Sequence, residues 1–216
     1  EIRGNAFQVA SEDVTRQDLA FRREVKFLLP NADVGKFRRL LECNGRRLVH
    51  NEPVSTVRSI YFDDVRLSDC QANLDGIRQR RKVRLRWYDS LTPSDPLFFE
   101  IKWRDNQVTG KHRLELRTRQ RVSELSYRQI VDELIDALPP QHVGDLLKRS
   151  EPVVIVEYRR EHFASADGRL RVTLDYDLAF YDQTGKQYIS TSFPHRMPDM
   201  IVLEAKGPQG CHEEIK

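Results

Sequence analysis

Cysteine and long apolar runs are scarce in this chain of 216 residues. Cys43, Cys70 and Cys211 are odd in number and far apart, so neither a disulfide framework nor a zinc site is expected. No stretch approaches the roughly 20 consecutive apolar residues of a membrane span, and the first residues contain no signal-peptide core. These absences favour a cytoplasmic chain without a membrane span of its own.

An excess of charge of one sign is also missing, although charged residues are abundant. The 36 lysines and arginines are nearly balanced by 33 acidic residues, which leaves a formal net charge of +3. Any basic surface must therefore come from local clustering. We expect a flexible N-terminal arm over residues 1–20 and a single domain over residues 21–216. The chain lacks an initiator methionine and stops on a charged stretch, as an excised domain truncated at its C-terminus would.

Hydrophobic periodicity predicts an α+β fold dominated by antiparallel strands. In the first strand, Val25 and Phe27 alternate with Glu24 and Lys26. The predicted helices are one that Asn31 caps and that ends near residues 44–45, one over 122–138 with Ser126 and Gln129 as a capping box, and one over 141–148. The predicted strands cover residues 21–29, 56–62, 78–88, 97–104, 111–117, 152–163, 170–177 and 200–207.

Charged residues recur at alternate positions along six of these strands. In the segment RQRRKVRLRWY, the face opposite Val83, Leu85 and Trp87 carries four cations. On one strand this pattern is typical of a solvated face with cross-strand ion pairs. On six strands it favours a closed barrel whose apolar side lies under the helices and whose charged lumen binds a polyanion. The alternating residues are Glu24/Lys26, Arg80/Lys82/Arg84/Arg86, Glu100/Lys102, Lys111/Arg113/Glu115/Arg117, Arg171/Thr173/Asp175 and Glu204/Lys206.

The residue types indicate a phosphate chain as that polyanion. Arginine offers forked donors that match phosphate oxygens, and lysine offers point charges. Proteins that bind single-stranded nucleic acid interleave cations with exposed aromatic rings, whereas Trp87, Phe99 and Trp103 fall on the face opposite the charges. The pattern therefore favours phosphate chains and argues against nucleic acid as a partner.

In chain order, the sequence contains the segments REVKFLL, SIYFDD, KVRLRWY, FFEIKWR, the hairpin with Lys111, EYRREHF, RVTLDYD and VLEAKG. This ordered set resembles the vacuolar transporter chaperone (VTC) domain, the polyphosphate polymerase branch of the triphosphate tunnel metalloenzyme (CYTH-like) superfamily. The resemblance implies an antiparallel eight-stranded closed β-barrel with helices packed outside. It also implies that this tunnel binds triphosphate or polyphosphate together with Mn²⁺ or Mg²⁺.

The resemblance further implies roles for individual residues. One departure concerns the superfamily's opening Glu-x-Glu-x-Lys strand, whose first position is Arg22 here, followed by Glu24 and Lys26. The loss of that carboxylate fits the polymerase branch better than a hydrolase. The implied catalytic cations are Arg84, Arg86, Lys102, Arg160 and Arg171, the phosphate-binding residues are Lys26, Arg80, Lys82, Lys111, Lys206 and Tyr158, and the metal-binding acids are Glu204 and Glu24.

The implied reaction is transfer of the γ-phosphate of ATP to a growing inorganic polyphosphate chain. Such a transfer demands positioning and charge neutralisation, and the acceptor oxygen is already ionised near neutral pH. Two alternatives are a non-catalytic module that binds polyphosphate or a triphosphate, and a hydrolase of tripolyphosphate or an organic triphosphate. The expected partners are ATP, inorganic polyphosphate, and a membrane-anchored partner or a membrane segment outside this chain. The sequence does not indicate an oligomeric state.

Overall fold

The computed structural model describes residues 5–10, 22–50, 52–106 and 108–208 of the chain. Contacts between residues divide the chain into two compact units. Unit 1 consists of Glu1–Gln17, Arg58–Val156 and Phe180–Pro194, and unit 2 consists of Asp18–Val57, Glu157–Ala179 and His195–Lys216. The single domain expected over residues 21–216 stays a prediction.

All eight predicted strands form, and three shorter strands join them. The hydrogen-bonded order is β1-β7-β6-β5-β4-β8-β9-β11-β2, with β3 paired to β8 and β10 paired to β9. The longer strands are β2 (Arg22–Pro30), β4 (Ser55–Asp63), β5 (Arg80–Tyr88), β6 (Leu97–Asp105), β7 (Val108–Thr118), β8 (Glu151–Ser165), β9 (Arg171–Asp182) and β11 (Met200–Pro208). The shorter strands are β1 (Phe7–Val9), β3 (Gly45–Leu48) and β10 (His195–Met197).

The prediction of an α+β fold with mostly antiparallel sheet and helices outside it is confirmed, but the closed eight-stranded barrel is wrong. Within the described residues, the sheet has 11 strands, and nine of them form an open path that ends at β1 and β2, which do not pair with each other. The edge of β7 is taken by β1, because Phe7 pairs with Thr118 and Val9 pairs with Leu116. Strands of three or four residues are too short to give a period-2 signal, so the sequence predicted none of the three.

The expected N-terminal arm falls partly outside the described residues, namely at residues 1–4 and 11–20. Where it is described, Phe7–Val9 form β1 at a place where the sequence predicted no element. Ala6 and Phe7 are buried, and the backbone N–H of Ala6 donates to Glu133 of helix α3 (Tyr127–Ala137). Burial of this short segment against a helix, which the local sequence does not signal, explains the difference.

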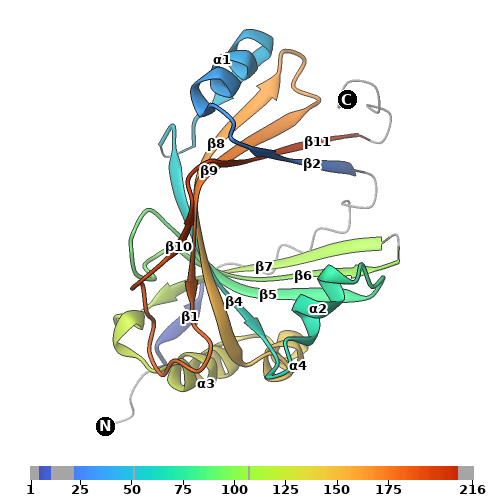
Figure 1. The fold of residues 1–216 in the computed structure, drawn as a ribbon. Coiled ribbons are helices and arrows are strands. Elements are labelled where there is room, and N and C mark those ends of the chain that lie inside the picture. The colour runs from blue at the N-terminus through green and yellow to red at the C-terminus, as the bar shows by residue number, and fades with distance from the viewer. Residues whose placement is uncertain (1–4, 11–21, 51, 107, 209–216) are drawn as a thin grey trace. The chain divides into compact units, whose positions relative to one another are not determined.

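The core of unit 1 lies on the apolar face of β5, β6 and β7. Val83, Leu85 and Trp87 are fully buried, as the alternation predicted. Figure 1 shows α3 and helix α4 (Pro140–Leu147) on one side of these strands. Ile130 and Leu146 bring one fully buried side chain from each helix into the core. The face with alternating charges is therefore the face turned away from the helices.

Helix α3 begins at the predicted capping box. Ser126 Oγ accepts from the backbone N–H of Gln129, and the Gln129 side chain accepts in return from the backbone N–H of Ser126 at 2.9 Å. Residues Val122–Glu124 form a separate 3-10 turn, so the helix starts later than the hydrophobic spacing suggested. Pro139 lies just beyond its end, and α4 follows.

Asp63 and Asp64 of the SIYFDD segment shape the turn after β4, and they also start a helix that the sequence did not predict. The buried Asp63 carboxylate accepts from the backbone N–H groups of Asp64, Asp69 and Cys70. Asp64 accepts from the backbone N–H of Ser68. Together the two side chains satisfy the free N–H groups of helix α2 (Ser68–Leu74).

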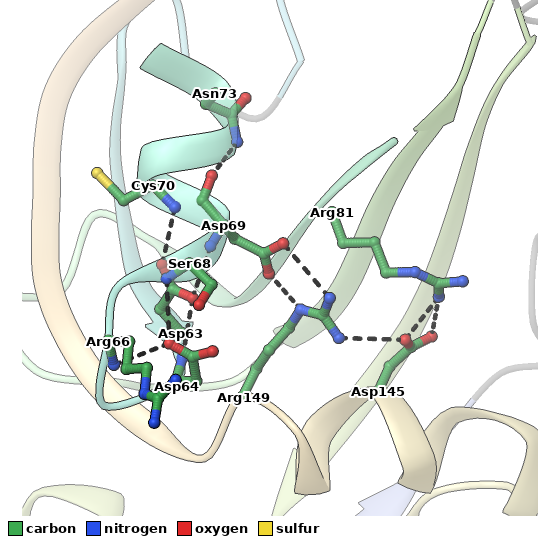
Figure 2. A network of polar contacts seen from close by, with 10 residues as sticks. All are labelled: Asp63, Asp64, Arg66, Ser68, Asp69, Cys70, Asn73, Arg81, Asp145 and Arg149. Atoms are coloured by element: carbon green, nitrogen blue, oxygen red, sulfur yellow. Dashed lines mark hydrogen bonds and ion pairs between the residues drawn. The ribbon is translucent and has the colours of Figure 1, made fainter. Parts of the chain in front are cut away.

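A chain of ion pairs fixes α2 and β5 to α4 (Figure 2). Arg149, just after α4, donates to Asp69 of α2 and lies 3.5 Å from Asp145 of α4. Arg81 of β5 donates two hydrogen bonds of 2.5 Å to the same Asp145 carboxylate. Arg81 lies on the helix-covered face of β5, so its contact with Asp145 connects that strand to α4.

In unit 2, helix α1 (Val34–Asn44) covers the apolar face of the sheet. Phe37 and Leu41 pack against a buried cluster that includes Phe163 and Leu174. The cap is Asp33 instead of the predicted Asn31, because Asp33 Oδ1 accepts from the backbone N–H of Lys36 at 3.0 Å. Asn31 lies outside the helix, at the end of β2, with a positive φ of 54°.

Glu161 anchors α1 to the sheet of unit 2. Its carboxylate is fully buried and accepts hydrogen bonds from Arg38 of α1, from Arg47 of β3 and from the Tyr176 hydroxyl. These three donors compensate the cost of burying the charge.

No helix within the described residues is long and apolar enough to cross a membrane. Cys43 and Cys70 are free and exposed, and Cys211 lies outside the described residues.

Candidate functional site

The charged face of unit 1 is organised around one buried carboxylate. We call Glu100, Arg84, Arg86, Lys111 and Arg113 the Glu100 cluster. Glu100 lies directly opposite Arg84 on one side and Arg113 on the other. Arg84 Nε lies 2.6 Å from Glu100 Oε2, and Lys111 Nζ lies 2.5 Å from Oε1. Arg86 and Arg113 approach the same carboxylate at 3.7 and 3.5 Å.

The Glu100 cluster therefore holds four cations around one carboxylate. Burial alone would raise the pKa of Glu100, but Arg84, Arg86 and Lys111 outweigh burial and lower that pKa below its ordinary value. Burial has the opposite effect on the ammonium of Lys111, whose pKa falls to about 8 despite its contact with Glu100. The cluster carries more positive charge than its own acid can neutralise, which favours the binding of an anion.

Two neighbouring hydroxyl groups complete this face. Tyr61 of β4 accepts a hydrogen bond of 2.7 Å from Arg84, and Ser59 of the same strand accepts one of 3.2 Å from Arg86. Burial raises the pKa of Tyr61, but Arg84 and Arg86 outweigh burial and lower it. Arg113 stacks over the ring of Phe98 at 3.8 Å. These contacts hold three guanidinium groups in fixed positions.

A row of three lysines lies next to the Glu100 cluster. Lys82, Lys102 and Lys111 lie directly opposite one another on β5, β6 and β7. Lys82 and Lys102 are exposed. Like charges directly opposite one another destabilise a sheet, and a bound phosphate chain would relieve that repulsion.

The charged face of unit 2 is organised around Glu204. We call Glu204, Glu24, Lys26, Lys206 and Arg160 the Glu204 cluster. Glu204 lies directly opposite Lys26, and Lys206 lies directly opposite Glu24, so cations and acids alternate across β11 and β2. Lys206 Nζ lies 2.7 Å from Glu204 Oε1, while Lys26 and Arg160 lie 3.9 Å from Oε2. Glu24 lies 3.4 Å from Lys26 and 3.7 Å from Lys206.

Arg160 is held in place from two sides. It makes two hydrogen bonds of 2.6 Å to Asp175 and stacks over the Tyr158 ring at 4.9 Å. Burial lowers its pKa, but the hydrogen bonds to Asp175 and the nearby acids outweigh burial and raise it, so the guanidinium stays charged. Arg160 is therefore fixed in position beside Glu204.

The Glu204 cluster also fits a divalent cation that is shared with phosphate. Burial raises the pKa of Glu204, but Lys206, Glu24 and Lys26 outweigh burial and lower it to about 2, so Glu204 is ionised at neutral pH. The described residues contain no group of three or more His, Cys, Asp or Glu side chains placed to hold a metal. Glu204 and Glu24 offer two carboxylates, and Mg²⁺ usually binds through one or two carboxylates plus water and phosphate oxygens. The donor set thus suits Mg²⁺ or Mn²⁺.

The structure divides the predicted site residues between the two charged faces. Arg84, Arg86 and Lys111 meet at Glu100, and Lys26, Glu24, Lys206, Arg160 and Tyr158 lie at or beside Glu204. Arg80 lies opposite Arg104 at the start of β5, away from Glu100, and Arg171 is exposed opposite Lys206. The side chain of Arg22 is not among those that the structure describes. The tunnel predicted to enclose these residues, and their roles, stay predictions.

Sequence reasoning missed four residues of the charged faces: Arg113, Tyr61, Ser59 and Thr173. Alternation along β7 and β9 did place Arg113 and Thr173 on these faces, but the resemblance gave them no role. Neither Tyr61 nor Ser59 was assigned a role, because an aromatic residue such as Tyr61 in SIYF is typical of core packing. The alternation of β4 could have found them.

Comparisons with known proteins identify the family. The VTC domain profile matches residues 21–215, and the chain therefore belongs to the VTC domain family. The resemblance seen in the sequence is thereby confirmed. A search among curated proteins gave no match.

The fold is similar to a solved structure described as a putative adenylyl cyclase from Hippeastrum with a dominant triphosphatase activity. The two chains are 12% identical, with a TM-score of 0.50, and the match covers 89% of this chain and 81% of that chain. At this identity the likeness concerns the fold alone.

Proposed function

We propose that this chain binds triphosphate and polyphosphate and acts as an ATP-dependent polyphosphate polymerase. The observation that carries the proposal is the Glu100 cluster, in which four cations surround one buried carboxylate. Membership of the VTC domain family supports the same ligand class. Forked arginine donors suit phosphate oxygens, and the adjacent lysine row extends the positive charge along the sheet.

In the proposed reaction, an oxygen of the terminal phosphate of a polyphosphate chain attacks the γ-phosphorus of ATP. A phosphorus–oxygen bond forms to the acceptor, the bond to the bridging oxygen of ADP breaks, and ADP leaves with that electron pair. Arg84, Arg86, Lys102, Arg160 and Arg171 are the proposed catalytic cations. Cations of this kind neutralise the negative charge of phosphate oxygens during such a transfer.

The remaining cations and acids have supporting roles in this proposal. Glu204 and Glu24 would hold Mn²⁺ or Mg²⁺, which supplies charge neutralisation at phosphate oxygens when it is bound. Glu100 and Asp175 orient arginines through the contacts described above. The proposed phosphate-binding residues are Lys26, Arg80, Lys82, Lys111, Lys206 and Tyr158.

The test is an assay of purified protein with ATP and Mn²⁺ or Mg²⁺, with and without a short polyphosphate primer. Products are resolved on gels while ADP and free phosphate are measured. We expect ADP together with lengthening chains, and loss of both in Arg84→Ala/Arg86→Ala and in Glu204→Gln. Arg128→Ala is the matched control, because Arg128 is 94% exposed on α3 and should leave the products unchanged.

Two other outcomes would replace the polymerase proposal. Free phosphate without chains would identify a hydrolase of triphosphates. Tight polyphosphate binding by calorimetry without turnover would identify a binding module. Thermal melting of each variant shows whether a lost product reflects lost folding.

A further inference from the structure

A buried hydroxyl without a partner lies beside Glu204. In the part of the chain that the structure describes, two buried side-chain atoms lack a hydrogen-bond partner, Arg47 Nε and Thr173 Oγ1. The Arg47 guanidinium has other partners, since it donates to Glu161 and to the Pro53 carbonyl on the helix-covered face. Thr173 has one hydroxyl only, and that hydroxyl makes no hydrogen bond.

Thr173 lies on the charged face of unit 2. Its side chain is 9% exposed and shares a face of β9 with Arg171 and Asp175. On β11 it lies directly opposite Glu204. Arg160 lies close by, because it binds Asp175 two residues further along β9. The hydroxyl is thus among the groups that line the Glu204 cluster.

Packing does not explain a threonine at this position. Valine has nearly the same shape and an equal preference for strands, and it would fill the same space without an unpaired hydroxyl. A buried donor without a partner costs folding free energy. Such a cost is understandable where the missing partner is a ligand that arrives later.

The other donors of the cluster differ from Thr173 in this respect. Lys26, Lys206 and Arg160 already contact Glu204, Glu24 or Asp175, so a phosphate must compete with those acids for them. A phosphate oxygen that accepts from Thr173 displaces no partner. A new hydrogen bond contributes most to the free energy of binding when its donor has no earlier hydrogen bond to lose.

We propose that the Thr173 hydroxyl contacts the substrate by donating a hydrogen bond to a non-bridging oxygen of a phosphate chain bound at the Glu204 cluster. This inference rests on the proposed function, because it requires that the cluster binds phosphate. It adds a neutral contact to a site otherwise made of charged residues.

The experiment compares Thr173→Val, Thr173→Ser and the unchanged chain by titration calorimetry with tripolyphosphate in metal-free buffer, and by thermal melting without ligand. We expect Thr173→Val to bind about tenfold more weakly, as the loss of one hydrogen bond to a charged oxygen predicts. Its melting temperature without ligand should rise by about 2–4 °C, because the unpaired hydroxyl is gone. Thr173→Ser keeps the hydroxyl and should bind nearly as tightly as the unchanged chain.

Thr118→Val is the matched control, since Thr118 lies on β7 on the face away from the alternating charges, and its affinity should not change. Equal tripolyphosphate binding by Thr173→Val and the unchanged chain would overturn the inference. If the unchanged chain does not bind tripolyphosphate at all, the proposed function itself fails first.

Discussion

Arg84 and Glu100 lie directly opposite one another on β5 and β6, with Arg84 Nε 2.6 Å from Glu100 Oε2. Glu100 is the one acid among four cations, so Glu100→Gln should leave those cations to repel each other. We expect a loss of about 3 kcal/mol in the free energy of unfolding without ligand, because a partner of buried charges is removed. Tripolyphosphate affinity should rise, since the competing carboxylate is gone. Urea unfolding with and without tripolyphosphate measures both effects.

Glu115→Gln provides the control for that change. Glu115 pairs with Arg117, whose side chain is 57% exposed, so its loss should change the free energy of unfolding by less than about 1 kcal/mol. Weaker tripolyphosphate binding by Glu100→Gln, with the fold intact, would contradict the view that Glu100 competes with phosphate.

Lys111 should make phosphate binding sensitive to pH. Its pKa is lowered from 10.5 to about 8, so the ammonium loses its proton in the folded protein as pH rises through 8. Tripolyphosphate affinity should therefore fall between pH 7 and pH 9. Lys111→Arg keeps its charge across this range and should show a flatter profile. Calorimetry at several pH values makes the comparison, and parallel profiles for the two proteins would contradict the role of Lys111.

The lowered pKa of Lys111 has the opposite effect on the free energy of unfolding. Between pH 8 and pH 10.5 the unfolded state holds more protons at Lys111 than the folded state does. The contribution of this lysine to the free energy of unfolding therefore rises with pH across that window. The difference between the unchanged chain and Lys111→Arg in urea unfolding should grow from pH 8 to pH 10.5, in favour of the unchanged chain.

Sequence periodicity was sufficient for most of the fold. Val83, Leu85 and Trp87 are fully buried as predicted, because alternation on a strand reports which side faces the core. The same alternation placed the cations of both charged faces except Arg160, which only the family resemblance indicated. Whether the sheet closes into a barrel could not be predicted in this way. Closure depends on which strand pairs with the free edge of β7, and the three-residue β1 that pairs there carries no periodic signal.

The site was predicted less completely than the fold. A repeating charge pattern shows that Arg84 and Lys111 share a face, but it does not show that both converge on Glu100. That convergence depends on register between strands, which fixes the opposite pairs. The unpaired hydroxyl of Thr173 was invisible for the same reason, because only the folded structure shows which polar atoms find partners.

Asp145 should be important for stability away from both charged faces. Its carboxylate accepts hydrogen bonds from Arg81 of β5 and from Arg149, and Arg149 also donates to Asp69 of α2. Asp145→Asn weakens two arginine contacts at once, and we expect a loss of about 1–3 kcal/mol in the free energy of unfolding. Asp132→Asn is the control, because its pair with Arg128 is largely exposed and should matter little. Equal urea midpoints for the two variants would contradict this role.

Gly110 should be irreplaceable at the β6–β7 hairpin, because it lies directly opposite Trp103. A Cβ atom at residue 110 would lie 2.2 Å from two carbons of the Trp103 ring, so the ring would have to move. We expect Gly110→Ala to lower the free energy of unfolding by about 1–3 kcal/mol, as overpacking does. It should also shift the indole N–H resonance of Trp103.

Gly144→Ala is the matched control for Gly110→Ala, since no atom lies within 4 Å of the Cβ that it would add in α4. Alanine favours a helix over glycine, so this variant should be as stable as the unchanged chain or up to about 1 kcal/mol more stable. Because Lys111 follows Gly110 directly, movement of the Trp103 ring should also displace the Lys111 ammonium from Glu100. Gly110→Ala should then bind tripolyphosphate more weakly than Gly144→Ala, and equal affinities would show that the hairpin absorbs the change without moving Lys111.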